Sequence, residues 1–127
     1  ANLKNVRVSF VSDKSFLFVR CEEYQLKQVF LNIMKNAIEA MPGGGELDII
    51  VYLKEQNVRI AFKDNGVGIP RHKLENLGEP FYSTKEEGTG LGLMVCFKII
   101  QNHSGSIHIQ SEEKVGSTFT ITLPQAL

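Results

Sequence analysis

The sequence has no excess of either charge and no long apolar run. Among its 127 residues, 14 Lys and Arg balance 14 Asp and Glu, so we expect no basic surface for nucleic acid. No segment reaches the roughly 18 consecutive apolar residues of a membrane-spanning helix, and "ANLKNVRVSF" lacks the basic and apolar regions of a signal peptide. We therefore expect a domain with no nucleic-acid or membrane contact. Because the chain does not begin with Met, we expect it to be part of a longer cytoplasmic protein, with any membrane anchor elsewhere.

Cysteine and histidine are scarce and scattered. Cys21 and Cys96 lie far apart beside apolar residues, and two cysteines make neither a zinc site nor the disulfide framework of a secreted protein. We expect two buried thiols in a reducing compartment. His72, His103 and His108 have no metal-ligand spacing and no paired carboxylate, so we expect no metal centre or catalytic triad from them.

Apolar periodicity predicts alternating strands and helices. Residues 6–11 and 16–21 read as strands joined by "SDKS", which predicts a hairpin. A stripe of apolar residues at 3.6 spacing predicts a helix over 22–41, ended by "MPGGG". The other predicted elements are strands 46–55 and 58–64, a buried helix from 90 to about 103, and strands 106–111 and 117–123. This order predicts an α+β two-layer sandwich with helices on one face of the sheet.

Glycine is concentrated in one part of the chain. Seven of the 11 glycines fall between Gly66 and Gly105. The polar segment 66–89 is long for a loop inside a compact domain, which favours a functional role. Glycine serves either as a flexible connector or where the backbone approaches another group closely.

Two asparagines lie one helical turn apart in the first predicted helix. Asn32 and Asn36 border the apolar stripe, with Glu39 on the same ridge, so we expect them to be half-buried. Asparagine is unfavourable within a helix, and an amide oxygen is a suitable ligand for Mg²⁺. Two exposed or locally bonded amides are the alternative.

Further polar groups follow the predicted strand 58–64. Asp64 at its end could accept a hydrogen bond from an amine such as adenine N6, although "DNG" also suits an ordinary turn. "GTGLGL" opens a helix, where free N–H groups bind anions, but it is neither a Walker A loop nor a dinucleotide fingerprint. Lys85 could reach a terminal phosphate or remain a solvated surface lysine.

The order of these motifs resembles the ATP-binding catalytic domain of sensor histidine kinases, in the superfamily shared with DNA gyrase, Hsp90 and MutL. "LKQVFLNIMKNAIEAM" is similar to the asparagine box, "DNGVGIP" to the first glycine box and "EPFYSTK" to the phenylalanine box. "GTGLGL" is similar to the second glycine box and "GSTFTITLP" to a final glycine–threonine element. The resemblance covers essentially the whole chain, with nitrogen-regulation and sporulation kinases as the most similar subgroups. It implies one Bergerat-type domain over residues 1–127, with a mixed, mostly antiparallel sheet and an ATP lid at about residues 71–89.

The resemblance also implies a Mg-ATP site. Asp64 would bind adenine N6, helped by Thr118 directly or through a water. Asn36 would ligate Mg²⁺, Asn32 would face the phosphates and Lys85 would contact the terminal phosphates. The other implied nucleotide-binding residues are Gly66, Gly68, Ile69, Phe81, Gly88, Thr89, Gly90, Leu91 and Gly92.

The implied activity is transfer of the ATP γ-phosphate to a histidine in two-component signal transduction. Asn32 stands where ATP-hydrolysing relatives carry a glutamate base, which suits transfer to histidine better than transfer to water. Glu39 stands where many kinases carry a basic residue, so one phosphate contact would be missing. None of the three histidines lies in an acceptor motif, so we expect the acceptor on a separate dimerisation domain and a response regulator as the downstream partner.

Other functions stay open at this point. An ATP-binding regulatory module without kinase activity is disfavoured by the intact asparagines and Lys85. A serine kinase of the anti-sigma type is disfavoured by "FYSTK" before "GTGLGL". A structural domain with turn glycines is disfavoured by the five motifs in order.

Overall fold

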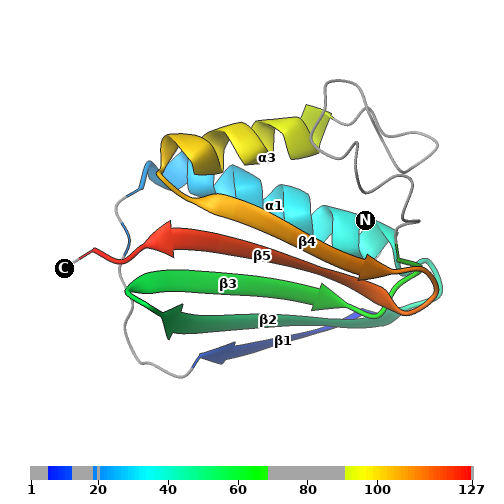
Figure 1. Cartoon of the computed structure of the whole chain (residues 1–127). Coiled ribbons are helices and arrows are strands. Elements are labelled where there is room, and N and C mark those ends of the chain that lie inside the picture. Colours follow the sequence, from blue (N-terminus) through cyan, green and yellow to red (C-terminus); the bar gives the residue numbers. More distant parts are fainter. Residues whose placement is uncertain (1–5, 13–18, 20, 69–90, 127) are drawn as a thin grey trace.

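The computed structural model describes residues 6–12, 19, 21–68 and 91–126 of the chain. In these residues, two helices cover one face of a five-stranded sheet (Figure 1). In chain order the elements are β1 (Val6–Ser12), α1 (Glu23–Glu39), β2 (Gly45–Lys54), β3 (Asn57–Asp64), α3 (Leu91–Asn102), β4 (Ser106–Glu112) and β5 (Gly116–Pro124). The two-layer α+β architecture expected from the sequence is confirmed.

The strands lie in the order β1-β2-β3-β5-β4. The β1–β2 pair is parallel and the other pairs are antiparallel, so the sheet is mixed and mostly antiparallel. The predicted hairpin between residues 6–11 and 16–21 is not found in the described residues. β1 instead pairs with β2, while Val19 and Cys21 lie outside any strand and the rest of that segment is outside the described residues. Alternation reveals a strand but not its partner, and α1 supplies the crossover that a parallel pair needs.

Helix α1 begins and ends where local chemistry requires it. The carboxylate of Glu22 accepts hydrogen bonds from the backbone N–H groups of Tyr24 at 3.2 Å and Gln25 at 2.9 Å, which caps the first turn. The buried positions recur at helical spacing and are Leu26, Val29, Ile33 and Ala37. This stripe attaches the helix to the sheet, because burying it removes a continuous apolar surface from water.

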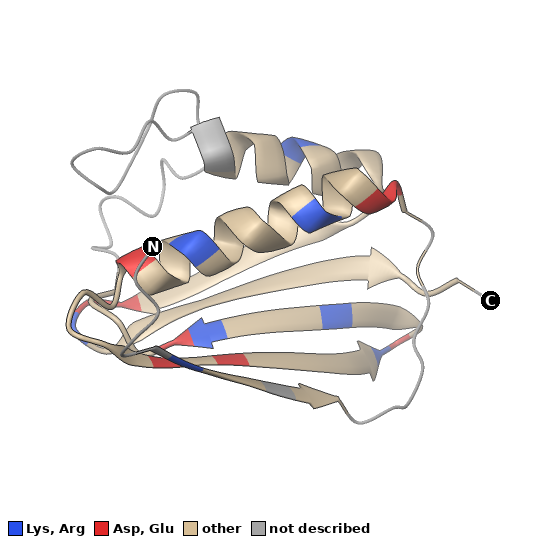
Figure 2. Ribbon diagram, turned by 180° about the vertical axis from the view of Figure 1, so that it is seen from behind, with Lys and Arg blue, Asp and Glu red and all other residues tan. Residues whose placement is uncertain are grey.

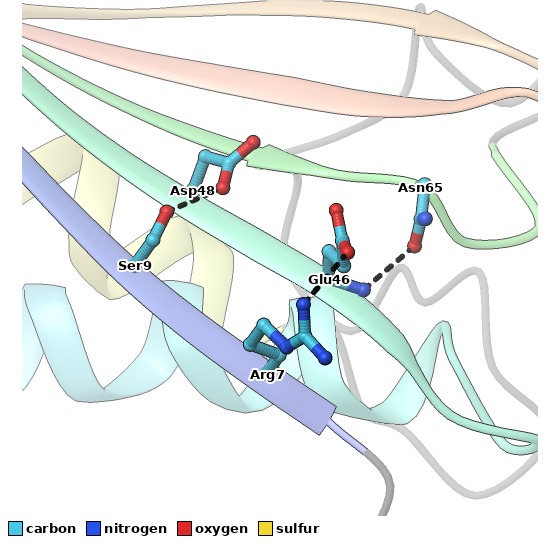
Figure 3. A network of polar contacts seen from close by, with 5 residues as sticks. All are labelled: Arg7, Ser9, Glu46, Asp48 and Asn65. Atoms are coloured by element: carbon cyan, nitrogen blue, oxygen red, sulfur yellow. Dashed lines mark hydrogen bonds and ion pairs between the residues drawn. The ribbon is translucent and has the colours of Figure 1, made fainter.

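Alternation along the strands divides the sheet into a covered and an uncovered face. The core residues on the covered face include Leu47, Ile49, Phe62, Phe119, Ile121 and Leu123. The rings of Phe30 and Phe62 join α1 to β3 with their centroids 5.8 Å apart. On the uncovered side, the hydroxyl of Ser9 donates a hydrogen bond to Oδ1 of Asp48. Arg7 and Glu46 form an ion pair there, with Nη1 of Arg7 3.7 Å from Oε1 of Glu46 (Figure 3).

Charged residues of both signs are interspersed over the helices and strands (Figure 2). Within the described part of the chain, no helix is long and apolar enough to cross a membrane, and no group of three His, Cys, Asp or Glu could hold a metal ion.

The two cysteines lie in different environments. Cys96 is buried in α3, as expected, but Cys21 is exposed. The prediction of two buried thiols is therefore wrong for Cys21, which precedes the cap of α1 instead of belonging to a buried strand.

Candidate functional site

Asp64 is a buried carboxylate at the end of β3. It is 5% exposed, and its Oδ1 accepts hydrogen bonds from the backbone N–H groups of Gly66 at 2.9 Å and Ser117 at 3.3 Å. Burial raises the pKa of Asp64 above its ordinary value, and the two backbone hydrogen bonds oppose this rise. A buried carboxylate of this kind can bind an amine donor strongly, because little water competes for it.

The loop after Asp64 is wedged between two other parts of the backbone. A Cβ on Gly66 would lie 2.4 Å from the carbonyl oxygen of Ala40, at the end of α1. Gly68 has φ of +74°, and a Cβ there would lie 2.1 Å from the carbonyl oxygen of Glu112. Both positions therefore require glycine for the protein's own packing, whereas the approach of a ligand ring to them stays a prediction.

Hydrogen bonds hold the same loop on three sides. Val67 donates its N–H to the carbonyl of Ala40 at 3.0 Å and accepts from the N–H of Lys114 at 2.6 Å. The side-chain oxygen of Asn65 accepts from the N–H of Glu46 at 2.9 Å (Figure 3). The segment that carries Asp64 is thus fixed to α1, β2 and the β4–β5 turn.

The two asparagines of α1 are half-buried, as expected from their place beside the apolar stripe. The backbone carbonyl of Asn36 accepts from Ala40 N–H at 3.0 Å, so Asn36 lies one turn before the carbonyl that Gly66 approaches. The fold therefore brings Asn36 and the Asp64 loop to the same end of the sandwich. Glu39 is exposed on the last turn of the helix.

Asn32 contacts the neighbouring helix through Cys96. Burial raises the pKa of the Cys96 thiol, and a hydrogen bond from the Asn32 side chain opposes this rise. The thiol itself donates to the carbonyl of Val29 at 3.9 Å. This contact links α1 to the helix that "GTGLGL" opens. No local pattern predicts it, because the two residues are far apart in the chain.

The sheet register does not bring Thr118 to Asp64. Thr118 stands opposite Lys63, whereas Ser117 stands opposite Asp64. Adjacent residues of a strand point to opposite faces, so Ser117 shares the helix-covered face with Asp64 and Thr118 lies on the other face. Sequence reasoning missed Ser117, although the apolar alternation at Phe119, Ile121 and Leu123 would have assigned it to the covered face.

Part of the predicted site lies outside the described residues: Ile69, Phe81, Lys85, Gly88, Thr89, Gly90 and the whole predicted lid. Leu91 and Gly92 are the first residues of α3, which confirms that "GTGLGL" opens a helix. That helix buries Cys96, Ile99 and Ile100.

Comparisons with known proteins show the family of this chain. The family model described as histidine kinase-, DNA gyrase B- and HSP90-like ATPase matches residues 21–127. Sporulation kinase E of Bacillus subtilis (strain 168) is 52% identical over 98% of this chain and 17% of its own length. The solved catalytic domain of histidine kinase ThkA is 35% identical with a TM-score of 0.85, covering 95% of this chain and 80% of that one.

A second ThkA structure, in complex with the response regulator protein TrrA, matches with a TM-score of 0.80 and 30% identity over 96% of this chain and 35% of that one. The chain spans about a fifth of the length of the sporulation kinases it matches. The chain belongs to the family of histidine kinase-, DNA gyrase B- and HSP90-like ATPases, and it is a histidine kinase catalytic domain of that family.

Proposed function

We propose that this domain binds Mg-ATP and transfers the γ-phosphate to a histidine on a separate dimerisation domain. The observation that carries the proposal is the buried Asp64 carboxylate, held by Gly66 and Ser117 beside the helix end that bears Asn36. Family membership supports a nucleotide as the ligand of that carboxylate.

The base would bind at Asp64. Its carboxylate accepts a hydrogen bond from the adenine N6 amine, and Ser117 takes the supporting role that the sequence assigned to Thr118. Ile69 and the loop from Gly66 to Gly68 lie next to Asp64 in the chain and border the base. A fixed, buried acceptor favours this role, because its orientation needs no reorganisation when the amine arrives.

The phosphates would bind toward α1 and the start of α3. Asn36 offers a neutral amide oxygen of the kind that Mg²⁺ accepts alongside waters and phosphate oxygens. Asn32 faces the phosphates, while Lys85 and the Gly88–Gly92 backbone hold the β- and γ-phosphates and Phe81 anchors the lid. Bound Mg²⁺ would supply charge neutralisation of the transferring phosphoryl group.

Asn32 favours transfer over hydrolysis. Its amide cannot accept a proton from water as a carboxylate base would, so attack by water is poorly assisted. A neutral histidine needs no such base, because its ring nitrogen already carries a free lone pair near pH 7. As the new nitrogen–phosphorus bond forms, the bond to the leaving ADP oxygen breaks.

The acceptor histidine and a response regulator would be the partners. The complex of ThkA with TrrA is a response-regulator complex of a similar kinase, and the sporulation kinases are much longer than this chain. We place the reaction in the cytoplasm, where ATP is supplied.

Calorimetric titration with Mg-ATP tests the proposal. We expect Asp64→Asn to abolish binding of Mg-ATP and of adenosine, and Asn36→Ala to weaken Mg-ATP while leaving adenosine unchanged. Asp48→Asn is the matched control, because Asp48 lies on the uncovered face with Ser9. Absence of Mg-ATP binding by the unmodified chain would overturn the proposal.

Phosphorylation of an added dimerisation domain then tests the transfer. Phosphate on histidine is lost in acid, whereas phosphate on serine persists. An acid-stable product would contradict histidine transfer and favour a serine kinase. ATP binding with no product would favour a regulatory module.

A further inference from the structure

A short polar row crosses the covered face of the sheet at the end that carries Asp64. Ser117 stands opposite Asp64 in the β3–β5 pair, and Ser111 stands opposite Ser117 in the β4–β5 pair. Ser117 is 5% exposed and Ser111 is half-buried. The neighbouring row on the same face is apolar, with Ile109 opposite Phe119, so the polar row is a local feature of this end.

The Ser111 hydroxyl makes two contacts with β5. Its Oγ lies 3.1 Å from the carbonyl oxygen of Gly116 and 2.7 Å from Oγ of Ser117. A carbonyl oxygen can only accept, and a hydroxyl has one proton to donate. Both contacts are hydrogen bonds under one assignment: Ser111 donates to Gly116, and Ser117 donates to Ser111.

This assignment determines whether the Ser117 hydroxyl, next to Asp64, acts as a donor or as an acceptor. The Ser117 proton points along the sheet toward Ser111, so the rest of its oxygen can only accept. Its backbone N–H is directed to Oδ1 of Asp64. Under this assignment, Ser117 Oγ and the Asp64 carboxylate are both acceptors on the covered face of the sheet.

We propose that Ser111 is a positioning residue that selects 6-amino purines over 6-oxo purines by holding Ser117 as an acceptor. The proposal rests on the proposed binding of a nucleotide base at Asp64. A 6-amino group donates to two acceptors, whereas a 6-oxo group would face them with another acceptor. Burying an acceptor without a donor is costly in free energy. The match of donors to acceptors can therefore separate 6-amino from 6-oxo purines strongly.

Mg-ATP and Mg-ITP are the matched probes, because ITP carries a 6-oxo group and lacks the 2-amino group of GTP. The unmodified chain should bind Mg-ATP more tightly. In Ser111→Ala the Ser117 hydroxyl is free to turn and donate, so the Kd(ITP)/Kd(ATP) ratio should fall by about fivefold, the value of one hydrogen bond. Ser111→Thr keeps the hydroxyl and should keep the ratio. Ser106→Ala, exposed and on the opposite face of β4, should also keep it.

A double variant separates positioning from a merely structural role. If Ser111 acts through Ser117, Ser111→Ala should not change the ratio further once Ser117→Ala is present. An unchanged ratio in Ser111→Ala, or a further fall in the double variant, would overturn the proposal. Failure of the unmodified chain to bind Mg-ATP would instead overturn the proposed function, so the two failures are distinguishable.

Discussion

Ser117 donates its backbone N–H to Oδ1 of Asp64 at 3.3 Å, across the β3–β5 ladder. The carboxylate is thus oriented by the sheet itself, together with the N–H of Gly66 in the following loop. Burial raises the pKa of Asp64 despite these two donors, so the charged form that the proposed function needs is disfavoured by the fold. A ligand that donates a hydrogen bond to this carboxylate would favour its charged form.

Asp64→Asn should therefore change the pH dependence of stability. The folded-state pKa of Asp64 lies above its ordinary value of 3.8, so the stabilising effect of the protonated carboxyl is complete below that value. It is lost as pH rises through the folded-state pKa. Because asparagine stays uncharged, the free energy of unfolding of the variant should rise relative to the unmodified chain between about pH 4 and about pH 7.

Urea unfolding at both pH values measures this difference. Any effect of the asparagine amide on stability that is the same at every pH cancels in this comparison. It cancels because the difference in free energy of unfolding at one pH is subtracted from that at the other. Asp48→Asn, on the uncovered face, is the control. A difference that stays constant or falls with rising pH would show that burial does not disfavour the charge of Asp64.

Gly66→Ala should destabilise the domain by about 1–3 kcal/mol, the usual effect of overpacking. The added Cβ would lie 2.4 Å from the carbonyl oxygen of Ala40, which is backbone and cannot rotate away. Gly43→Ala is the matched control, since its Cβ would have nothing within 4 Å, and should change stability by less than about 0.5 kcal/mol. Equal losses of stability for Gly66→Ala and Gly43→Ala in a denaturant titration would mean that the backbone at Gly66 shifts at little cost to make room for the added Cβ.

Local patterns predicted the elements well but not the pairing of the first strand. The apolar stripe and "MPGGG" predicted a helix over 22–41, and α1 spans Glu23–Glu39. In contrast, the alternation at residues 6–11 predicted a strand but not its parallel pairing with β2. Pairing depends on contacts between residues far apart in the sequence, which periodicity does not encode.

The site residues show the same difference between local patterns, which the sequence reveals, and contacts between distant residues, which it does not. Asp64 could be found because a carboxylate after an apolar strand precedes glycines. Thr118 was assigned from the motif alone, without the strand alternation that places it on the opposite face from Asp64. The contact between Asn32 and Cys96 depends on how two helices pack, so no local pattern predicts it.

Cys96→Val should weaken the binding of nucleotide phosphates. Valine is apolar and somewhat larger than cysteine, and it cannot accept the hydrogen bond from the Asn32 side chain, so the amide loses its fixed orientation. We expect the affinity for Mg-ATP to fall by about three- to fivefold, in line with one hydrogen bond. The affinity for adenosine, which lacks phosphates, should not change.

Two variants control for this effect. Cys96→Ser replaces the thiol with a hydroxyl that can still accept from Asn32, so this variant should bind Mg-ATP as before. Cys21→Val tests loss of the exposed thiol and should also bind normally. Equal losses for adenosine and Mg-ATP in Cys96→Val would point to general disruption of the helix packing instead.

His103 joins the end of α3 to the start of α1, away from the Asp64 loop, and its loss should affect stability more than binding. Nδ1 contacts the carbonyl of Ile99 at 2.7 Å, and Nε2 accepts from the N–H of Glu22 at 2.9 Å. These partners assign a neutral ring with its proton on Nδ1. His103→Ala removes both contacts and should lower the free energy of unfolding by about 1–2 kcal/mol, measured in urea. His108→Ala, which removes an exposed ring from β4, should have little effect. A large loss of Mg-ATP affinity in folded His103→Ala would instead mean that this junction is coupled to the nucleotide site through the two helices.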